Sequence, residues 1–289
     1  MTDTDGPAVV FAHNGSVRLA TQSFGDDSGH PVVLIMGATA SMLWWPDALC
    51  ERLARSGNHV IRYDQRDTGA STSRPLGDVD YRVEDLVEDL VAVLDAHGLE
   101  SAHLVGMSLG GYIAQIAALS HADRVRSLTL IASEPLGGVA DSGGIDQSFM
   151  DHFATMEHLD WYDRNQVVAF MVEIGRLSTG TGREFDADAT ERRAGAEFDR
   201  TTTMASAFNH SMIVADESWN GRLGEIEVPV LIIHGSDDPI VPVANAHAIA
   251  EQARDTQTLI IEGAGHELNG ADIATICDEF DRFRAAIEH

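Results

Sequence analysis

The sequence predicts an α/β fold in which helices flank a mostly parallel central sheet and a helical cap is inserted late in the chain. Three observations lead to this fold class. Apolar runs of strand length, such as PVVLIM at 31–36, are continuous rather than alternating, as in strands buried on both faces. These runs alternate with helical patterns, which is typical of a parallel sheet. The alternation stops over residues 134–227, where an insertion is expected.

The first third of the chain predicts a hairpin followed by strands that alternate with helices. Asn14-Gly15 is a hairpin turn signal, so the opening strands add an antiparallel edge to the sheet. Gly57 and Gly98 each follow a helical pattern and are helix stop signals. The expected strands lie near 8–12, 17–23, 31–36 and 59–64, and the expected helices near 46–56 and 82–97.

The rest of the sheet is expected on either side of the insertion. VPVLIIHG and TQTLIIEG are apolar runs that predict two further buried strands after it. An amphipathic helix should end the chain. The expected strands lie at 102–106, 125–133, 228–235 and 256–263, and the expected helices near 113–120, 243–253 and 271–286.

The interval 134–227 is rich in Met and aromatic residues and is too long for a structureless loop. We therefore expect a helical cap there, inserted into a core made of residues 1–133 and 228–289. Most of its apolar side chains should pack on one another. Some should line an apolar pocket between the cap and the end of the sheet.

The net charge of -27 constrains the partners of the protein. Phosphate binding needs basic surface, so the charge argues against nucleic acid and against docking on anionic membranes. We interpret it mainly as an acidic, soluble surface rather than as a means to attract a cationic substrate. All 19 basic residues are Arg, so no lysine can form a Schiff base. A small-molecule partner is expected, and the oligomeric state stays open.

The two cysteines, Cys50 and Cys277, make neither a disulfide framework nor a thiolate metal site. The opening MTDTDGPAVV lacks the basic and apolar stretches of a secretion signal, and no apolar run is long enough for a membrane span. We therefore expect a cytoplasmic protein with no metal and no cofactor.

The stretch HLVGMSLGG holds the strongest candidate for chemistry. Ser108 lies between Gly106 and Gly110 in a G-x-S-x-G pattern, after a predicted strand and before a predicted helix. That context is typical of a nucleophile held on a sharp turn. Glycines two residues before and after the serine fit a turn that leaves no room for Cβ atoms. We therefore expect Ser108 to be a nucleophile.

A serine hydroxyl needs a base to take its proton, usually a histidine that a carboxylate holds. Both partners should follow later strands, because the carboxyl ends of parallel strands meet at one edge. His266 follows the strand at 256–263 in a short glycine-containing loop, and we expect it to be the base. His234 ends its strand inside an apolar run, so we expect a packing role. Asp237 and Asp238 both remain candidates for the carboxylate.

An oxyanion hole is expected where the first buried strand ends in Met36-Gly37-Ala38-Thr39. A glycine there allows a turn that points backbone N–H groups at the substrate. The N–H of Ala38 and that of Leu109, directly after the serine, are the two expected donors.

With these residues in place, the sequence resembles the α/β-hydrolase superfamily across nearly the whole chain. Within it, the sequence most resembles the aclacinomycin methylesterase-like branch of serine esterases, which acts on polyketide esters. The matching stretches are VVLIMGATAS, Trp45-Pro46, HVIRYDQRDTGAST at 59–72, HLVGMSLGG, DPIVP at 238–242 and GAGH at 263–266. The resemblance implies the α/β-hydrolase fold.

The resemblance also implies roles for single residues. In that family the aspartate before the proline is the acid, which here is Asp238, and the oxyanion residue matches Ala38. Arg66 and Asp67, in the 59–72 stretch, are expected to form a structural ion pair. Dehalogenases and epoxide hydrolases carry Asp where this chain has Ser108, and proline iminopeptidases carry HGGPG where it has MGATA, so both groups are excluded.

These inferences predict a cofactor-free serine esterase that cleaves a carboxylic ester or lactone of a hydrophobic small molecule. A polyketide methyl ester or a macrolactone is the leading substrate class. Four bulky side chains are expected to line the pocket: Trp44, Trp45, Phe153 and Trp161. Two alternatives remain. One is C–C bond hydrolysis or perhydrolysis by the same three residues, and the other is a ligand-binding protein without turnover.

Overall fold

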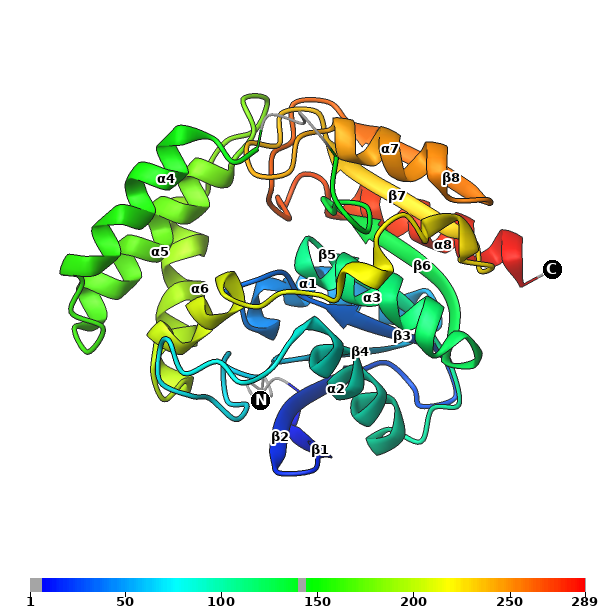
Figure 1. Cartoon of the computed structure of the whole chain (residues 1–289), viewed down its shortest axis with the longest axis horizontal. Coiled ribbons are helices and arrows are strands. Elements are labelled where there is room, and N and C mark those ends of the chain that lie inside the picture. Colours follow the sequence, from blue (N-terminus) through cyan, green and yellow to red (C-terminus); the bar gives the residue numbers. More distant parts are fainter. Residues whose placement is uncertain (1–6, 140–143, 289) are drawn as a thin grey trace, which may run out of the picture.

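In the computed structural model, which describes residues 7–139 and 144–288, the strands of the described chain form one eight-stranded sheet (Figure 1). The strand order is β1-β2-β4-β3-β5-β6-β7-β8. The strands are β1 Val10–Asn14, β2 Val17–Phe24, β3 His30–Ile35, β4 Asn58–Tyr63, β5 Ala102–Met107, β6 Val125–Ile131, β7 Val230–Gly235 and β8 Thr256–Ile261. The predicted ranges of the core and the cap include residues 1–6, 140–143 and 289, which lie outside the described residues.

The sheet is mostly parallel, as predicted. β4, β3, β5, β6, β7 and β8 pair in parallel, whereas the β1–β2 hairpin joins β4 antiparallel at one edge. All residues of β4, β5 and β7 are buried, which explains the mainly apolar sequences of β5 and β7. β4 also buries three polar side chains, those of Asn58, His59 and Arg62. The carboxyl ends of these strands therefore meet at one edge of the sheet, where the loops that follow them can form a site.

The prediction that the last strand is buried is wrong. β8 is the outer strand beside β7, and its side chains are partly or fully exposed. An apolar run shows that a segment is apolar but does not show how many neighbours the strand has. The physical reason for the exposure is that an edge strand lacks a neighbour on one side.

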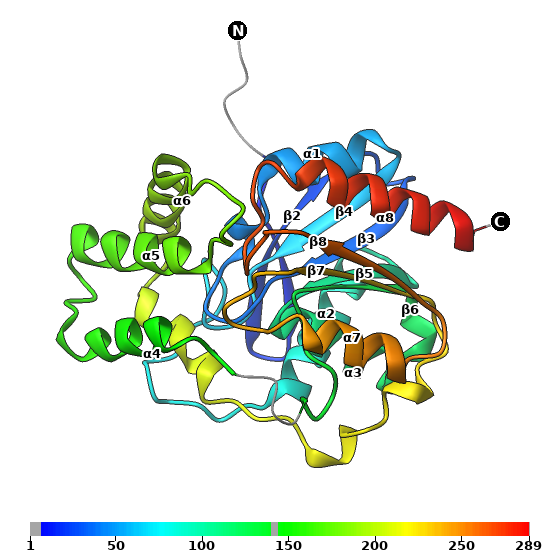
Figure 2. The same cartoon turned by 90° about the horizontal axis from the view of Figure 1, so that it is seen from above.

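Helices cover both faces of the sheet (Figure 2). On one face, α2, α3 and α7 bury a core that includes Leu86, Ile113 and Ile249. On the other face, α1 and α8 bury a second core that includes Leu49 and Phe280. The helices are α1 Asp47–Arg55, α2 Val83–Ala96, α3 Leu109–Ser120, α7 Ala244–Gln252 and α8 Ile273–Ile287.

The interval between β6 and β7 contains helices of its own, namely α4 Gln147–Ala154, α5 Arg164–Ser178 and α6 Ala187–Arg200. We call these three the cap helices. They lie together to one side of the sheet in Figures 1 and 2. They share a small apolar cluster that includes Val167, Phe170 and Phe208. Asp163 and Asp186 accept hydrogen bonds from backbone N–H groups at the start of α5 and α6, so each helix begins at a capping aspartate.

None of the helices in the described ranges combines the length and the apolar character that a membrane crossing requires.

Candidate active site

Ser108 lies at a strained turn between β5 and α3. Its φ of 51° and ψ of -120° are unfavourable for a residue with a Cβ atom. The flanking glycines explain how the turn is possible. A Cβ atom at Gly106 would lie 2.3 Å from the carbonyl oxygen of Gly110, and one at Gly110 would lie 2.0 Å from that of Ile35. The strand and helix therefore approach too closely for any other residue, as the pattern predicts.

The backbone of Ser108 is fixed by the neighbouring strand. Its N–H donates to the carbonyl of Ile131 at 2.9 Å, and its carbonyl accepts from the Ser133 hydroxyl at 2.9 Å. These bonds hold the strained turn, because a strained residue persists only when its surroundings determine its conformation. The Ser108 side chain lines the cleft between the sheet and the cap helices.

His266 and Asp238 form a buried pair. His266 Nδ1 lies 2.7 Å from Asp238 Oδ2, and the Asp238 side chain is fully buried. Asp238 Oδ1 also accepts from the N–H groups of Ile240 and Val241, each at 2.8 Å. Burial raises the pKa of this carboxyl, but the charge and hydrogen bond of His266, together with the Val241 N–H, outweigh burial and hold the pKa below its ordinary value. Asp238 is therefore a carboxylate that is held ready to accept from His266.

The structure separates the alternatives that the sequence left open. Asp237 lies at the surface, where Ser236 and Thr181 donate to it, and it does not contact His266. His234 is buried, and its Nε2 donates to the Val241 carbonyl at 2.7 Å. Because His234 does not line the cleft, its geometry is that of a packing residue beside the Asp238 loop.

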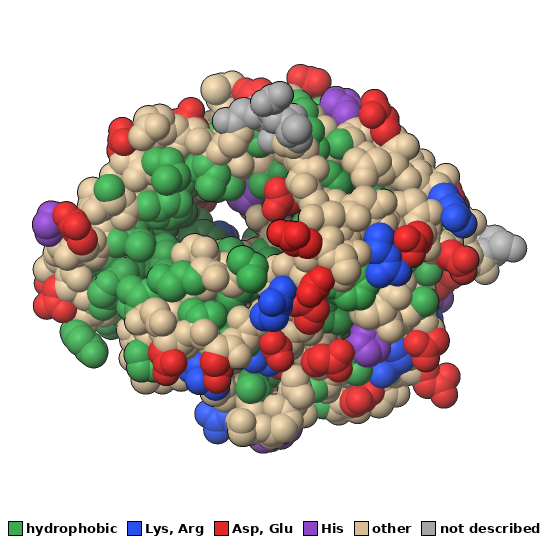
Figure 3. Space-filling model, in the orientation of Figure 1, with side chains coloured by type: hydrophobic (Ala, Val, Ile, Leu, Met, Phe, Trp, Pro, Cys, Tyr) green, Lys and Arg blue, Asp and Glu red, His purple; other side chains and the backbone are tan. Residues whose placement is uncertain are grey.

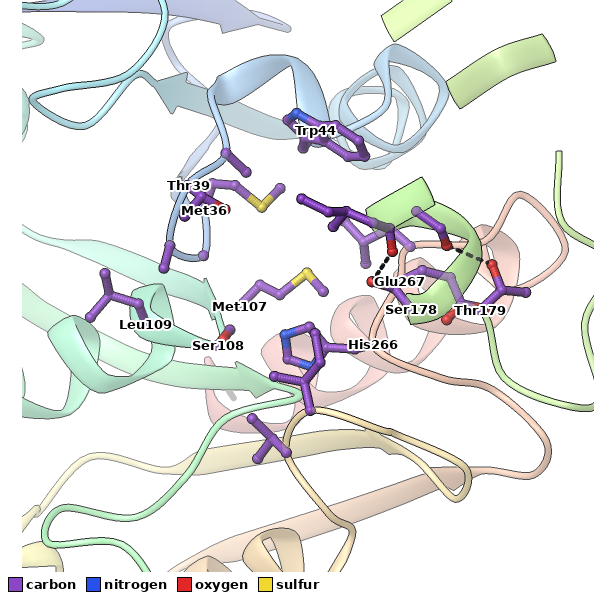
Figure 4. A pocket seen from close by; sticks show the side chains of 18 of the residues that line it. Met36, Thr39, Trp44, Met107, Ser108, Leu109, Ser178, Thr179, His266 and Glu267 are labelled. Carbon is purple, nitrogen blue, oxygen red and sulfur yellow. Dashed lines mark hydrogen bonds between the residues drawn. The ribbon is translucent and has the colours of Figure 1, made fainter. Parts of the chain in front are cut away.

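Figure 4 shows the Ser108 side chain close to the His266 imidazole. Both residues line the cleft, but Ser108 Oγ is not hydrogen-bonded to His266 in this structure. Asp238 Oδ2 can only accept, so the proton of the imidazole is assigned to Nδ1 and Nε2 is left with its lone pair. Catalytic hydrogen bonds are often long in a free enzyme and shorten when substrate binds.

Residues 36–42, which we call the oxyanion loop, lie against Ser108. A Cβ atom at Gly37 would lie 3.2 Å from Ser108 Cβ. The loop is tied to the segment after β4, because Gln65 Nε2 donates to the Met36 carbonyl at 2.6 Å. Ala38 and Leu109 both line the cleft, as Ser108 does. The two residues whose N–H groups are the expected oxyanion donors therefore share a cleft with the expected nucleophile.

The 59–72 stretch contains an ion pair, but it is not the predicted one. Arg66 pairs with Asp89 of α2 through two contacts of 2.7 Å, and does not pair with Asp67. Asp67 instead accepts from the hydroxyl of Tyr81 at 2.6 Å and from Asn209 at 3.0 Å. Sequence neighbours at a turn point in different directions, which is why the expected Arg66–Asp67 pair does not form.

A segment of the cap interval, Ser178 to Arg183, is bonded to the loop that carries His266. The Ser178 carbonyl accepts from the His266 N–H at 2.8 Å, and the Gly182 N–H donates to the Gly263 carbonyl at 2.9 Å. Gly180 packs so closely that a Cβ atom there would lie 2.3 Å from the Gly263 carbonyl oxygen. The cap interval therefore contacts the His266 loop directly. The two glycines of STGTG at 178–182 are the sequence signal of this close approach.

The cleft has a volume of about 1770 Å³ and is lined largely by apolar side chains. Figure 3 shows it as a hollow with hydrophobic side chains on the side of the cap helices and acidic side chains beside it. Trp44 and Phe153 line it, as predicted. Trp45 and Trp161 do not. Trp45 is fully buried in the core under α1 and α8, and Trp161 packs within the cap cluster against Phe208.

Sequence reasoning also missed two carboxyl groups, one that lines the cleft and one that is buried on α6. Glu267 follows His266 and lines the cleft, and burial is the main cause that raises its pKa to about 7. Glu197 of α6 is 1% exposed, and burial likewise raises its pKa to about 7. Neither glutamate lies in a sequence pattern that marks it as buried. Among the described residues, no group of three or more His, Cys, Asp or Glu side chains is arranged to hold a metal ion.

Comparisons with known proteins agree with this geometry. The sequence model of the alpha/beta hydrolase fold family matches residues 30–270. Rhodomycin D methylesterase DnrP of Streptomyces peucetius is 33% identical over 275 residues, which cover 88% of this chain and 91% of that protein. Rhodomycin D methylesterase DauP of a Streptomyces species is 33% identical over 272 residues, covering 87% and 90%. The predicted resemblance to polyketide methylesterases is confirmed.

The solved structures show the same fold. The crystal structure of the esterase RhEst1 from Rhodococcus sp. ECU1013 superposes with a TM-score of 0.78 and covers 96% of this chain and 99% of that one. The two sequences are only 21% identical, so this likeness shows the fold alone. The predicted fold class is thus confirmed by an independent comparison.

Proposed function

The chain belongs to the alpha/beta hydrolase fold family, and from this premise we propose that it is a serine esterase that works through an acyl-enzyme. The methylesterase relatives make the chain a carboxylic ester hydrolase. The proposal adds the residues and the substrate class. Ser108 is the nucleophile, His266 the general base and acid, and Asp238 the carboxylate that orients the imidazole.

One observation carries the proposal. The carboxylate of Asp238 holds His266 Nδ1 at 2.7 Å, beside a serine on a strained turn, and Ser108 and His266 open into one apolar cleft. A residue in a sparsely populated conformation supports a functional role when the surrounding structure is built to keep it there. Three coordinated groups of this kind are what acyl transfer needs.

The first half of the reaction forms the acyl-enzyme. Ser108 Oγ attacks the ester carbonyl carbon while His266 Nε2 takes the hydroxyl proton, and Asp238 stabilises the imidazolium that results. The carbonyl oxygen becomes an oxyanion, which accepts hydrogen bonds from the N–H groups of Ala38 and Leu109. The C–O bond to the alcohol then breaks, and His266 gives the proton to the departing alcohol oxygen.

The second half releases the acid. Water loses a proton to His266 Nε2 and attacks the acyl carbon, and the same two N–H groups hold the second oxyanion. The bond from the acyl carbon to Ser108 Oγ breaks, and His266 returns the proton to Ser108. The product is a carboxylic acid, and the enzyme is restored without a cofactor.

The cleft supports a bulky hydrophobic substrate. Its lining is largely apolar. Its volume of about 1770 Å³ is larger than a short acyl ester would fill, because sites for small molecules commonly occupy roughly 300–1,000 Å³. The relatives DnrP and DauP are methylesterases of rhodomycin D. We therefore assign to this chain a large polycyclic or polyketide-derived substrate, with a methyl ester as the first choice and a macrolactone as the second.

The test is a substrate panel with a matched serine control. The panel contains p-nitrophenyl esters of increasing acyl length, methyl esters of polycyclic aromatic acids, a macrolactone, a C–C cleavage diketone, and acetate with peroxide. Ester or lactone turnover should depend on Ser108, so Ser108→Ala should lose at least about 10³-fold in kcat. Ser120→Ala, at the exposed end of the same helix, should keep full activity.

Two results would count against the proposal. The first is turnover of the diketone or of peroxide in preference to every ester. The second is an Ser108→Ala variant whose ester turnover stays near that of the natural protein.

A further inference from the structure

The oxyanion loop contains a strained residue that the loop cannot hold by itself. Thr39 has a φ of 64°, in the left-handed region that is unfavourable for a residue with a Cβ atom. Such a conformation persists when partners outside the turn determine it. Thr39 directly follows Ala38, whose N–H is the proposed oxyanion donor. The partners that hold this turn therefore also set the direction of that donor.

Three backbone N–H groups of the loop donate to side chains from elsewhere in the chain. The Met42 N–H donates to Asp64 Oδ1 at 2.9 Å, and Asp64 belongs to the segment after β4. The other two acceptors come from the interval between β6 and β7. The Ser41 N–H donates to Glu197 Oε1 at 2.9 Å, and the Thr39 N–H donates to His210 Nδ1 at 3.3 Å.

Glu197 binds the loop at Ser41 and also binds Trp44, two residues beyond the loop. It accepts from the Trp44 indole N–H at 2.5 Å, and Trp44 lines the cleft. Both oxygens of the carboxylate are thus used, in a site where Glu197 is 1% exposed. A buried N–H that loses its acceptor is destabilising, so the loop is expected to rearrange when Glu197 is changed.

The helix that carries Glu197 is itself attached to the core at the same place. Arg200, one turn further along α6, pairs with the fully buried Asp64 through contacts of 3.0 and 2.7 Å. Asp64 is also the acceptor of the Met42 N–H. Helix α6 therefore reaches the loop directly through Glu197 and indirectly through Arg200 and Asp64.

His210 is oriented for the bond from Thr39. Its Nε2 lies 2.8 Å from the Arg66 carbonyl, which can only accept, so the ring proton is on Nε2 and Nδ1 accepts. Burial lowers the pKa of His210, which agrees with a neutral ring. His210 lies in the short helix Met204–Ser211, which follows α6 in the chain.

We propose that Glu197 and His210 are positioning residues that hold the oxyanion loop in its reactive conformation, so that the oxyanion hole depends on the cap interval being seated on the core. This inference rests on the proposed function of Ser108. The hydrogen bonds of Glu197 and His210 go to the loop, to Trp44 and to Arg66, and not to Ser108, His266 or Asp238, although His210 lines the cleft. They act by fixing the turn from which the Ala38 N–H points.

The test uses Glu197→Gln, because an amide can accept only one of the two hydrogen bonds and offers an N–H to the other donor. A misplaced oxyanion donor reduces the stabilisation of the transition state more than that of the bound substrate. We expect kcat on a p-nitrophenyl ester to fall about 10- to 100-fold, with KM changed by less than about 3-fold. Glu191→Gln, on the exposed side of the same helix, should change neither.

A second readout separates positioning from a loss of structure. A trifluoromethyl ketone adds to the nucleophilic serine and presents an oxyanion, whereas the matching methyl ketone mimics only the bound substrate. Glu197→Gln should lower the affinity for the trifluoromethyl ketone by the same factor as kcat/KM. The affinity for the methyl ketone should stay nearly unchanged. A variant with unchanged kcat, or with a raised KM alone, would overturn the positioning role.

His210 supplies an independent pair of variants if Glu197→Gln does not fold. His210→Leu removes the acceptor of the Thr39 N–H, and His210→Asn keeps an acceptor near the position of Nδ1. We expect His210→Leu to lose kcat and His210→Asn to recover most of it, and equal activities would contradict the proposal. If the natural protein itself shows no ester turnover and no reaction at Ser108, the proposed function fails and not the positioning step alone.

Discussion

At the scale of single residues, the reactivity that we propose for Ser108 depends on its neighbours. A hydroxyl is a weak nucleophile until a base is held beside it in the right tautomer. Here we propose that the fully buried Asp238, with a lowered pKa, selects that tautomer because its Oδ2 accepts from His266 Nδ1. The charge of Asp238, and not only its shape, should therefore matter to the rate.

Exchanging Asp238 for Asn tests this directly. Asp238→Asn keeps the shape but places an N–H donor where the carboxylate oxygen was, which favours the wrong imidazole tautomer. We expect kcat to fall by about 10⁴-fold, as when the aspartate of a serine protease is changed in this way. Asp237→Asn is the matched control, since the Asp237 carboxylate accepts from Thr181 and Ser236 and is not bonded to His266, and its kcat should stay within about 2-fold. Equal losses in the two variants would contradict the assignment.

Glu197 should make stability depend on pH in a defined direction. Burial is the main cause that raises its pKa to about 7, and the charge of Asp64 adds to the rise, while Arg193 and the Arg200–Asp64 pair lie nearby. A carboxyl with a raised pKa in the folded state releases its proton more readily when unfolded. Its contribution is therefore fully present below about pH 4.5 and is lost as the pH rises through about 7.

The measurement compares the free energies of unfolding of the natural protein and Glu197→Gln between pH 5 and pH 8. The natural protein should lose stability relative to the variant by roughly 3 kcal/mol over this range, since each pKa unit corresponds to about 1.4 kcal/mol. A difference that stays constant with pH, or that changes in the opposite sense, would show that folding does not raise the pKa of Glu197.

Residue identities could be predicted from the sequence where a pattern constrained them. Ser108 lies in a five-residue pattern with a steric reason for each glycine, and His266 follows a strand. The choice between Asp237 and Asp238 depended on which carboxylate turns inward, and the bare spacing of adjacent residues does not show this. Glu197 and His210 could not be found, because their partners are backbone N–H groups about 156 and 171 residues away.

At the scale of elements, the junction of β5 and α3 is the feature that the site depends on most. Gly106 faces the backbone of Gly110 and Gly111 so closely that the strand and helix touch through main-chain atoms. The helix starts directly after Ser108, which places the N–H of Leu109 at the site. The same junction therefore brings the strand and the helix together and sets the position of the Leu109 N–H.

Gly106→Ala should separate strand and helix. Its Cβ would lie 2.3 Å from a backbone oxygen that no side-chain rotation can relieve. We expect the free energy of unfolding to fall by about 1–3 kcal/mol, as for other overpacked cores. Gly270→Ala is the control for stability, because a Cβ there meets nothing within 4 Å. Chemical denaturation of both variants measures the difference, and an unchanged midpoint for Gly106→Ala would contradict the close packing.

Strands and helices could be predicted well, because the apolar runs of β3 to β7 and the helical spacing of α2 follow directly from burial. The exposure of the edge strand and the identity of the residues that line the pocket could not be predicted from the sequence. The apolar run of β8 does not reveal that β8 is the outer strand. Trp44 and Trp45 are adjacent, yet only Trp44 points to the cleft, since neighbours in a short helix face different directions.

At the scale of the whole molecule, two properties of the cleft should affect the substrate. One is the position of the cleft between the sheet and the cap interval, because that interval is hydrogen-bonded to both the His266 loop and the oxyanion loop. The other is charge. The chain carries a net charge of -27, and acidic side chains outnumber basic ones among the residues that line the cleft.

This field should discriminate against anionic substrates. We expect kcat/KM for an ester with an additional carboxylate to be lower than for a neutral ester of the same size. The difference should shrink as the ionic strength rises from about 0.01 M to about 0.15 M, because the Debye length falls from about 30 Å to about 8 Å. A ratio of the two kcat/KM values that does not change with salt would show that the charge of the molecule does not reach the cleft.

Labelling by a fluorophosphonate is the most direct test of whether Ser108 is an activated nucleophile. The probe is added in steps, ester turnover is followed in each sample, and the modified residue is found by peptide mass spectrometry. We expect a single adduct on Ser108, turnover that disappears in proportion to labelling, and no adduct in Ser108→Ala. An adduct on a different residue, or full turnover in a protein that carries the label on Ser108, would contradict this expectation.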